Sequence, residues 1–267
     1  MSQPKYRRPL NPKQLDILII LYKFRFANVD LFCRFLDLDN QSGMYKRLKI
    51  LEDQNYIGRI FTNQDMIDRR PALYYLRTAG VNYLKTIDGV SHKAIANTVR
   101  DNNRKRSFID RCLMILELHN KLRQLYGNKL QFYAKPEISD YDFFPKNLPD
   151  GYMLINEKPY MLEWFASNTP YQQIRGKISQ LLTHYDSGEW DSSGEDYPTI
   201  LFICADVYVE RLVKRIASRA FYKAEDQGID PEGLTILTTT LKAFNTAQDA
   251  QQTIWSDNRE PEGLVRL

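Results

Sequence analysis

The feature that most constrains the fold is a change of hydrophobic periodicity within residues 1–90. Leu15, Leu18 and Tyr22 recur at helical spacing behind the capping pair Asn11-Pro12. Two shorter stretches of helical spacing follow, then two strand-like runs, then one more helical stretch. Three helices, a two-stranded hairpin and a closing helix are the order of a winged helix, and we expect that fold for residues 1–90.

The boundaries of the later elements follow from capping and turn residues. Ser42 is the expected cap of the third helix, after a polar turn. The strand-like runs cover residues 56–61 and 72–76 and are joined by a polar segment. Thr78 is the expected cap of the last helix, which extends to about Ile87.

This fold predicts which side chains meet a nucleic acid. A helix fits the major groove of duplex DNA, and the outward side chains near its N-terminus reach base edges. In the third helix these are Gln41, Ser42, Tyr45 and Lys46, and Lys49 is expected to lie nearer a phosphate. Arg69 and Arg70 lie near the tip of the predicted wing and would reach the adjacent backbone or minor groove. The alternative is that these are ordinary solvated surface charges.

The distribution of charge favours the same half of the chain. Residues 1–110 contain 20 Lys and Arg against 11 Asp and Glu, whereas the remainder contains 17 against 22. A polyanion would therefore meet the N-terminal part. Arg104, Lys105 and Arg106 belong to residues 91–106, predicted as a basic linker that either lies along phosphates or only connects two domains.

The pattern changes after this linker. Residues 107–245 predict an α/β domain of αβββαβ order, followed by one more helix and strand. Residues 246–267 form a polar tail that Ile254 and Trp255 are expected to fold back onto the domain. The predicted class of the whole chain is α+β.

Acidic residues interrupt the apolar strands of this domain. Asp150 opens the second predicted strand, Glu163 lies inside the third, and Glu137 follows the first. A carboxylate in an apolar strand is costly without a partner, and clustered carboxylates suit Mg²⁺, which activates water for phosphodiester attack. Asp150 and Glu163 are therefore the candidate metal ligands.

The spacing of these acids resembles the PD-(D/E)XK nuclease family. The resemblance implies that Asp150 and Glu163 are the acids of its motif, but Phe165 stands where the motif has its lysine. Some members supply that lysine from the following helix, where Lys177 lies. A surface or structural role is favoured for Lys177, so the domain is predicted to be a degenerate nuclease that does not cleave.

A second resemblance covers nearly the whole chain. The segments that show it are Arg47-Leu48-Lys49-Ile50-Leu51-Glu52, Arg70-Pro71-Ala72-Leu73-Tyr74-Tyr75-Leu76, Thr78-Ala79-Gly80, Leu148-Pro149-Asp150-Gly151 and Tyr160-Met161-Leu162-Glu163. In these segments the chain is similar to the replication-relaxation family, which is found on plasmids and other mobile elements and is associated with plasmid replication and DNA relaxation. The chain differs after Glu163, where Trp164-Phe165 replaces a common acidic residue.

Other classes of function lack support in the sequence. The chain has no Gly-rich phosphate loop, no zinc-ligand spacing and no run of about 18 apolar residues, so we expect no membrane partner. Residues 1–8 lack the apolar run of a signal peptide. The odd number of distant cysteines suits free thiols in the cytoplasm.

We therefore expect a protein of a plasmid or other mobile genetic element that binds double-stranded DNA and acts in its replication or relaxation, mobilisation or regulation. Its partners would be replication or mobilisation proteins, and no cofactor is needed for DNA binding. Two alternatives remain at this point. One is an active Mg²⁺-dependent endonuclease using Asp150, Glu163 and Lys177. The other is a transcriptional repressor that acts as a homodimer.

Overall fold

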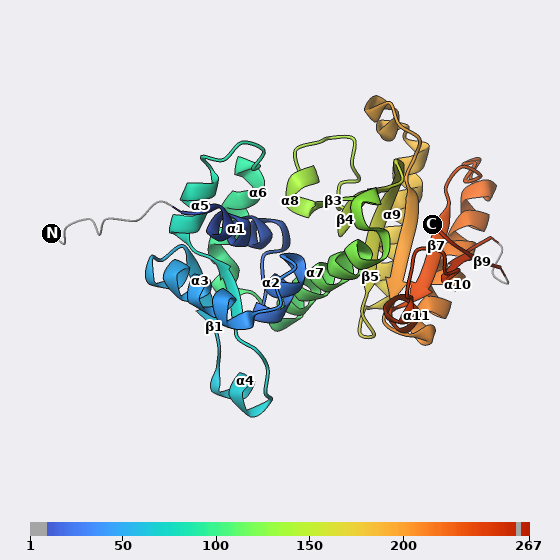
Figure 1. Ribbon diagram of the computed structural model, residues 1–267. Helices are drawn as coiled ribbons and strands as arrows, with labels where there is room; N and C mark the ends of the chain where they lie inside the picture. Colours follow the sequence, from blue (N-terminus) through green and yellow to red (C-terminus); the bar gives the residue numbers. More distant parts are fainter. Residues whose placement is uncertain (1–9, 260–262) are drawn as a thin grey trace. The chain divides into compact units, whose positions relative to one another are not determined.

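The chain folds into two compact units, Met1–Asn120 and Lys121–Leu267 (Figure 1). The structure, a computed structural model, describes residues 10–259 and 263–267. Segment 1–8, compared above with a signal peptide, lies outside the described residues. The first unit is mainly helical and the second is built on a seven-stranded sheet, so the predicted α+β class is confirmed.

The first helix begins as its capping residues predict. Helix α1 (Pro12–Phe24) has Asn11 and Gln14 in a reciprocal capping box, with Pro12 at its first position. Its apolar side chains Leu18 and Leu21 are fully buried. Helix α1 is thus the central helix of the first unit's core.

Helices α2 (Val29–Phe35) and α3 (Gln41–Asp53) follow α1. Ser42 is not the cap of α3, because the Asn40 side chain accepts the Ser42 backbone N–H at 2.8 Å. The cap of α3 is therefore Asn40, and the helix begins at Gln41. Met44, in the first turn of α3, is fully buried, so this side of α3 faces the core.

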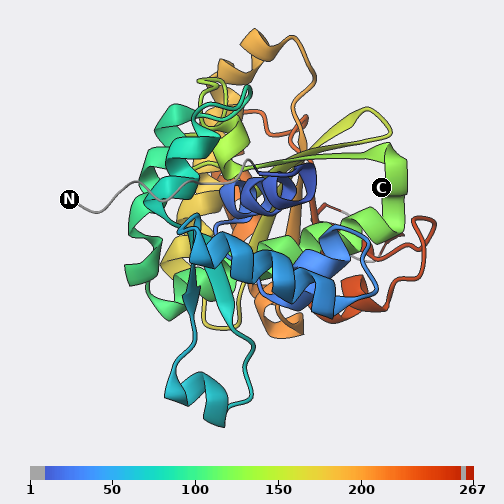
Figure 2. The same cartoon turned by 60° about the vertical axis from the view of Figure 1, so that its left-hand side comes forward.

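The predicted hairpin is present. Strands β1 (Ile57–Ile60) and β2 (Leu73–Leu76) pair antiparallel, and Ala27 forms an isolated bridge with Tyr74 of β2. The segment between the strands, predicted only as polar, contains helix α4 (Asn63–Ile67). A capping box of Thr62 and Asp65 starts this helix. Figure 2 shows α4 extending away from the helices of its own unit.

Residues 91–106 were predicted as a linker, but most of them are helical. After α5 (Thr78–Leu84) come α6 (His92–Ala96) and the 3-10 helix η1 (Asn97–Asn103). Asp101 of η1 is fully buried and accepts a hydrogen bond from Arg25 Nε at 2.7 Å. This buried ion pair fixes the segment to the first unit.

Two smaller boundaries also differ from prediction. Thr78 is the first residue of α5 and not its cap, and Arg77 at the cap makes no side-chain capping bond. Helix α5 ends at Leu84 and not at Ile87 as predicted. A hydrogen-bonded turn connects Leu84 to Ile87. Helix α7 (Arg106–Tyr126) is a single helix that includes the boundary between the two units at Asn120.

The predicted αβββαβ order extends from α7, which begins in the first unit, to β6 in the second, with the short helix α8 (Lys135–Ile138) between the first two strands. The first three strands of the second unit pair antiparallel in the order β3, β4, β5, and β5, β6 and β7 are parallel. The seven strands are β3 (Leu130–Ala134), β4 (Gly151–Ile155), β5 (Lys158–Phe165), β6 (Thr199–Cys204), β7 (Ile236–Thr240), β8 (Trp255–Asp257) and β9 (Leu264–Val265). Helices α9 (Tyr171–Asp186) and α10 (Val207–Asp226) connect the parallel strands.

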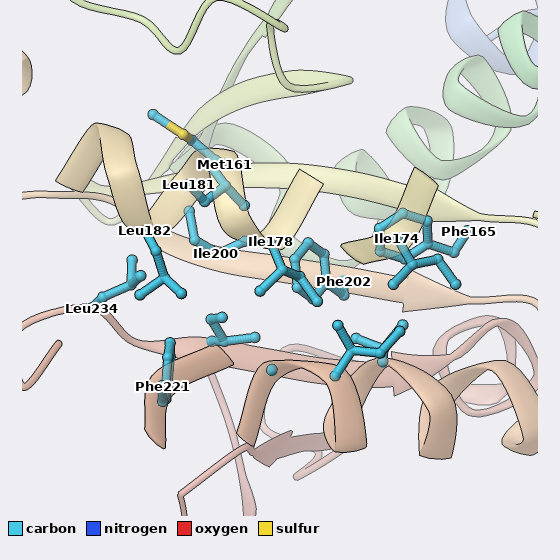
Figure 3. Packing of buried hydrophobic residues seen from close by; sticks show 14 of the residues in the cluster. Met161, Phe165, Ile174, Ile178, Leu181, Leu182, Ile200, Phe202, Phe221 and Leu234 are labelled. Carbon is cyan, nitrogen blue, oxygen red and sulfur yellow. The ribbon is translucent and has the colours of Figure 1, made fainter. Parts of the chain in front are cut away.

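The core of the second unit lies between its sheet and these two helices. Figure 3 shows Phe165 and Phe202 of the sheet meeting Ile174 and Ile178 of α9 in one cluster, which α10 joins. Burying one such side chain contributes roughly 1.5–3 kcal/mol, so this cluster fixes α9 and α10 on one face of the sheet.

Shorter elements complete the second unit. They are η2 (Gly127–Lys129), α8 (Lys135–Ile138), η3 (Glu189–Ser193) and α11 (Leu241–Thr246). The tail returns to the domain as expected, because β8 pairs with β7 and Trp255 is 1% exposed. Within the described ranges, none of the helices is long and apolar enough to cross a membrane.

Candidate nucleic-acid interface and acid–lysine cluster

The exposed face of α3 contains all the predicted contacts of that helix. Met44, Leu48 and Leu51 are fully buried and fix the orientation of α3. The residues on its exposed side include Gln41, Ser42, Tyr45, Lys46 and Lys49. Tyr45 is 53% exposed, although aromatic side chains are usually buried. The structure thus presents two cations, two polar groups and one aromatic ring on one helix surface.

The cations of this face are weakly held by the protein itself. Lys49 Nζ lies 3.6 Å from Asp53 Oδ1 one turn later, and both side chains are more than 60% exposed. Exposed pairs of this kind contribute little stability. Lys49 can therefore exchange Asp53 for a phosphate at small cost.

The loop between β1 and β2 presents both predicted arginines to solvent. Arg69 is exposed and adopts the left-handed conformation at φ 54°, directly after α4. Arg70 Nη2 lies 3.3 Å from Asp68 Oδ2, again an exposed pair. Met66 and Ile67 beside them are 62% and 71% exposed. The tip therefore combines two cations with two exposed apolar side chains.

The base of this loop is fixed to the unit. The Thr62 hydroxyl and backbone N–H both donate to Asp65, and these bonds hold the pKa of the Asp65 carboxyl below its usual value. Arg106 Nη1 lies 3.4 Å from Asp65 Oδ1. Helix α4 thus has a defined place relative to α7 within the first unit.

The three residues of the predicted basic cluster, Arg104, Lys105 and Arg106, have different partners. Arg104 Nε lies 3.3 Å from the buried Asp101, and Arg106 Nε lies 2.7 Å from Asp110. Lys105 is exposed, and the described part of the chain gives it no acidic partner. Arg104 and Arg106 therefore hold the first unit together, whereas Lys105 has its charge available.

Asp150 and Glu163 come together in the second unit, where both are buried, at 4% and 3% exposure. The Asp150 backbone N–H donates to the Leu162 carbonyl at 2.9 Å, and Asp150 Oδ2 accepts the Trp164 N–H at 2.9 Å. Asp150 thus bonds to the residues on both sides of Glu163 on β5.

Each of these two acids forms an ion pair with a lysine. Lys177 Nζ lies 2.5 Å from Glu163 Oε1 and also donates to the carbonyls of Asn147 and Leu148, at 2.6 and 3.3 Å. The side chain of Lys177 is only 11% exposed, so of the surface or structural role favoured from the sequence, its contacts match the structural one. We call Asp150, Glu163, Lys177 and the Lys135 described next the acid–lysine cluster.

Lys135 is the member that the sequence analysis missed. Its Nζ lies 2.9 Å from Asp150 Oδ1. The register pairs Ala134 of β3 with Gly151 of β4, so the next residue of the first strand faces the preceding residue of the second. Strand pairing therefore predicts this contact, but only once the register is known.

Glu137 was predicted to lie with Asp150 and Glu163, but its carboxylate caps α8 instead. Its Oε2 accepts the Ala134 N–H at 2.9 Å and closes the first turn of α8. Among the described residues no three His, Cys, Asp or Glu side chains gather around one point. Two carboxylates and two ammonium groups cancel in charge, and a resident Mg²⁺ would have to displace both lysines.

His184 is buried in the last turn of α9. Its Nδ1 lies 2.9 Å from the Tyr197 hydroxyl and its Nε2 lies 3.0 Å from the Phe143 carbonyl oxygen. Burial lowers the pKa of His184. These contacts tie α9 to neighbouring loops.

Comparisons with protein-family models, with curated proteins and with solved structures find no match to this chain. Its function is therefore inferred from the surfaces and the cluster described above.

Proposed function

We propose that this chain is a duplex-DNA-binding protein of a plasmid or other mobile element, and that its first unit is a winged helix. In this proposal α3 enters the major groove and the loop with Arg69 and Arg70 contacts the neighbouring backbone or minor groove. The observation that supports it is the exposed face of α3, where Lys46, Lys49 and Tyr45 gather on a helix fixed by a buried opposite face.

In this proposal the second unit is a PD-(D/E)XK-like domain that does not cleave DNA. The αβββαβ order and the placement of Asp150 and Glu163 on neighbouring strands support the relationship. Neutralisation of both acids by lysines supports a structural role for the cluster. The family resemblance noted in the sequence adds replication, relaxation or mobilisation of the element as the process served.

The test is the affinity of the full chain for duplex DNA. We expect Lys46→Ala with Lys49→Ala to weaken binding at least tenfold at about 0.1 M salt, because two cationic contacts with DNA are lost. The matched control is Lys13→Ala with Lys93→Ala, which removes two exposed cations from α1 and α6. Equal affinities of the two variants would exclude α3 as the DNA-contacting helix.

A metal-dependent nuclease is the second candidate, favoured by the contact between Lys177 and Glu163 beside Asp150. Incubation with supercoiled plasmid and Mg²⁺ or Mn²⁺ separates the two candidates. We expect a gel shift without nicking. Nicking that requires the metal and disappears in Glu163→Gln would place the nuclease first.

A further inference from the structure

Helices α9 and α10 line an open hollow of about 310 Å³ in the second unit. Leu182, Ile216 and Ala224 are its buried apolar side chains. Arg175 of α9 and Arg219 and Lys223 of α10 line it as well. Its lining residues include the hydroxyl groups of Ser179 and Thr183 but no acid.

The three cations of this hollow are exposed, and within the described ranges no acid lies within ion-pair distance of them. Cations placed together without acids repel one another, and an anion relieves this repulsion. Hydroxyl and guanidinium groups are also the usual donors to phosphate oxygens. The hollow therefore has the chemistry of a phosphate site.

The cations continue along α10 as a longer row. Arg211, Arg215, Arg219 and Lys223 follow one another at intervals of four residues, which is about 18 Å of helix. Glu210 pairs with Lys214 on another side of α10, and Glu225 and Asp226 come only at its C-terminal end. A row of this length fits a polymer of phosphates better than a single phosphate group.

Two tyrosines lie on the same surface as this row. Tyr208 and Tyr222 are 76% and 69% exposed, so most of each ring is accessible to a ligand. At 100° per residue, both fall within the third of the helix circumference that contains the four cations. We call these six residues the α10 track: Tyr208, Arg211, Arg215, Arg219, Tyr222 and Lys223.

We propose that the α10 track binds single-stranded DNA. Its cations would contact the phosphates, and its tyrosines would stack on bases that duplex DNA keeps paired and inaccessible. The residues after 110 carry an excess of acids, so this concentration of cations does not reflect the average charge of that part. The choice of DNA as the nucleic acid rests on the proposed function, whereas the preference for a single strand comes from the exposed rings.

The test is titration of the full chain with a labelled oligothymidylate of about 16 nucleotides, followed by fluorescence anisotropy. We expect Arg215→Ala with Arg219→Ala and Lys223→Ala to reduce the slope of log K against log salt by about 2, because each phosphate contact contributes about 0.7. The control Lys129→Ala with Lys158→Ala and Lys242→Ala removes three exposed cations elsewhere in the second unit. Equal slopes in the two variants would overturn the proposal.

A second pair of variants tests stacking and does not alter charge. Tyr208→Ala with Tyr222→Ala should weaken binding of the oligothymidylate about fivefold or more per tyrosine, whereas Tyr208→Phe with Tyr222→Phe should retain it. Unchanged affinity in the alanine variant would overturn the single-strand preference. Circular dichroism of each variant confirms that the fold is intact.

The same preparations distinguish this proposal from the proposed function. Variants of the α10 track should keep their duplex affinity, and Lys46→Ala with Lys49→Ala should keep the affinity for oligothymidylate. Loss of duplex binding in the α10-track variants, with none in the α3 variant, would overturn the role of α3. It would also overturn the preference of the α10 track for single strands.

Discussion

At the scale of single residues, the acid–lysine cluster explains how β5 tolerates Glu163 among apolar neighbours. Glu163 is buried, and the nearly buried Lys177 compensates its charge at 2.5 Å. Removal of one partner from a buried ion pair costs more than removal of both, because a single charge is then left in an apolar environment.

Lys177→Met should therefore lower the free energy of unfolding by about 3–5 kcal/mol. Adding Glu163→Gln to this variant should restore a large part of the loss, since no charge is then left unpaired. Urea unfolding of both single variants and the double variant measures the coupling. Additive losses would contradict a direct interaction of Glu163 with Lys177.

The burial of His184 predicts that the free energy of unfolding depends on pH. Burial lowers its pKa in the folded state below the ordinary value of 6.5, so the unfolded chain takes up the proton first as the pH falls. The contribution of neutral His184 is fully present above about pH 6.5 and is lost as the pH falls through the folded pKa.

The stability of the wild type should thus decrease between pH 7.5 and pH 5.5 more than that of His184→Asn. Thermal unfolding at both pH values measures the difference. His92→Asn is the control, because His92 is exposed at the start of α6. A pH dependence identical in wild type and His184→Asn would show that His184 keeps an ordinary pKa.

At the scale of elements, the sequence predicts the helices and strands well where their buried residues recur regularly. The exposed face of α3 follows from the positions of Met44, Leu48 and Leu51. Helix α4 has no such pattern, since Met66 and Ile67 are exposed and the helix has only five residues. Its capping residues Thr62 and Asp65 were the available indication.

Because this capping box begins α4, Thr62→Ala should cost about 1 kcal/mol and expose the α4 amides to exchange with solvent. Hydrogen exchange should increase in residues 63–67 and stay unchanged in α1. Unchanged protection of α4 would show that Arg106 alone holds the helix in place.

The acid–lysine cluster shows why a site is harder to predict than an element. Asp150 and Glu163 are conspicuous in the sequence as acids of apolar strands, and the structure brings them together. Lys135 and Lys177 depend on the register of β3 with β4 and on the placement of α9 against β5. These are long-range facts that local patterns do not contain.

At the scale of the whole molecule, the chain divides its chemistry between two units. The segment predicted as a linker ending at residue 106 is folded, and the boundary between the two compact units falls at Asn120 within α7. In our proposal the first unit binds duplex DNA through α3, and the second holds single strands on the α10 track.

The most direct test of the central claim is binding of the wild-type chain to duplex DNA over a series of salt concentrations. Contacts of the four cations Lys46, Lys49, Arg69 and Arg70 with DNA, each displacing counterions, predict that log K falls linearly with log salt, with a slope of about −4 or steeper. Binding that is absent at low salt, or that does not change with salt, would contradict the claim that this chain is a DNA-binding protein.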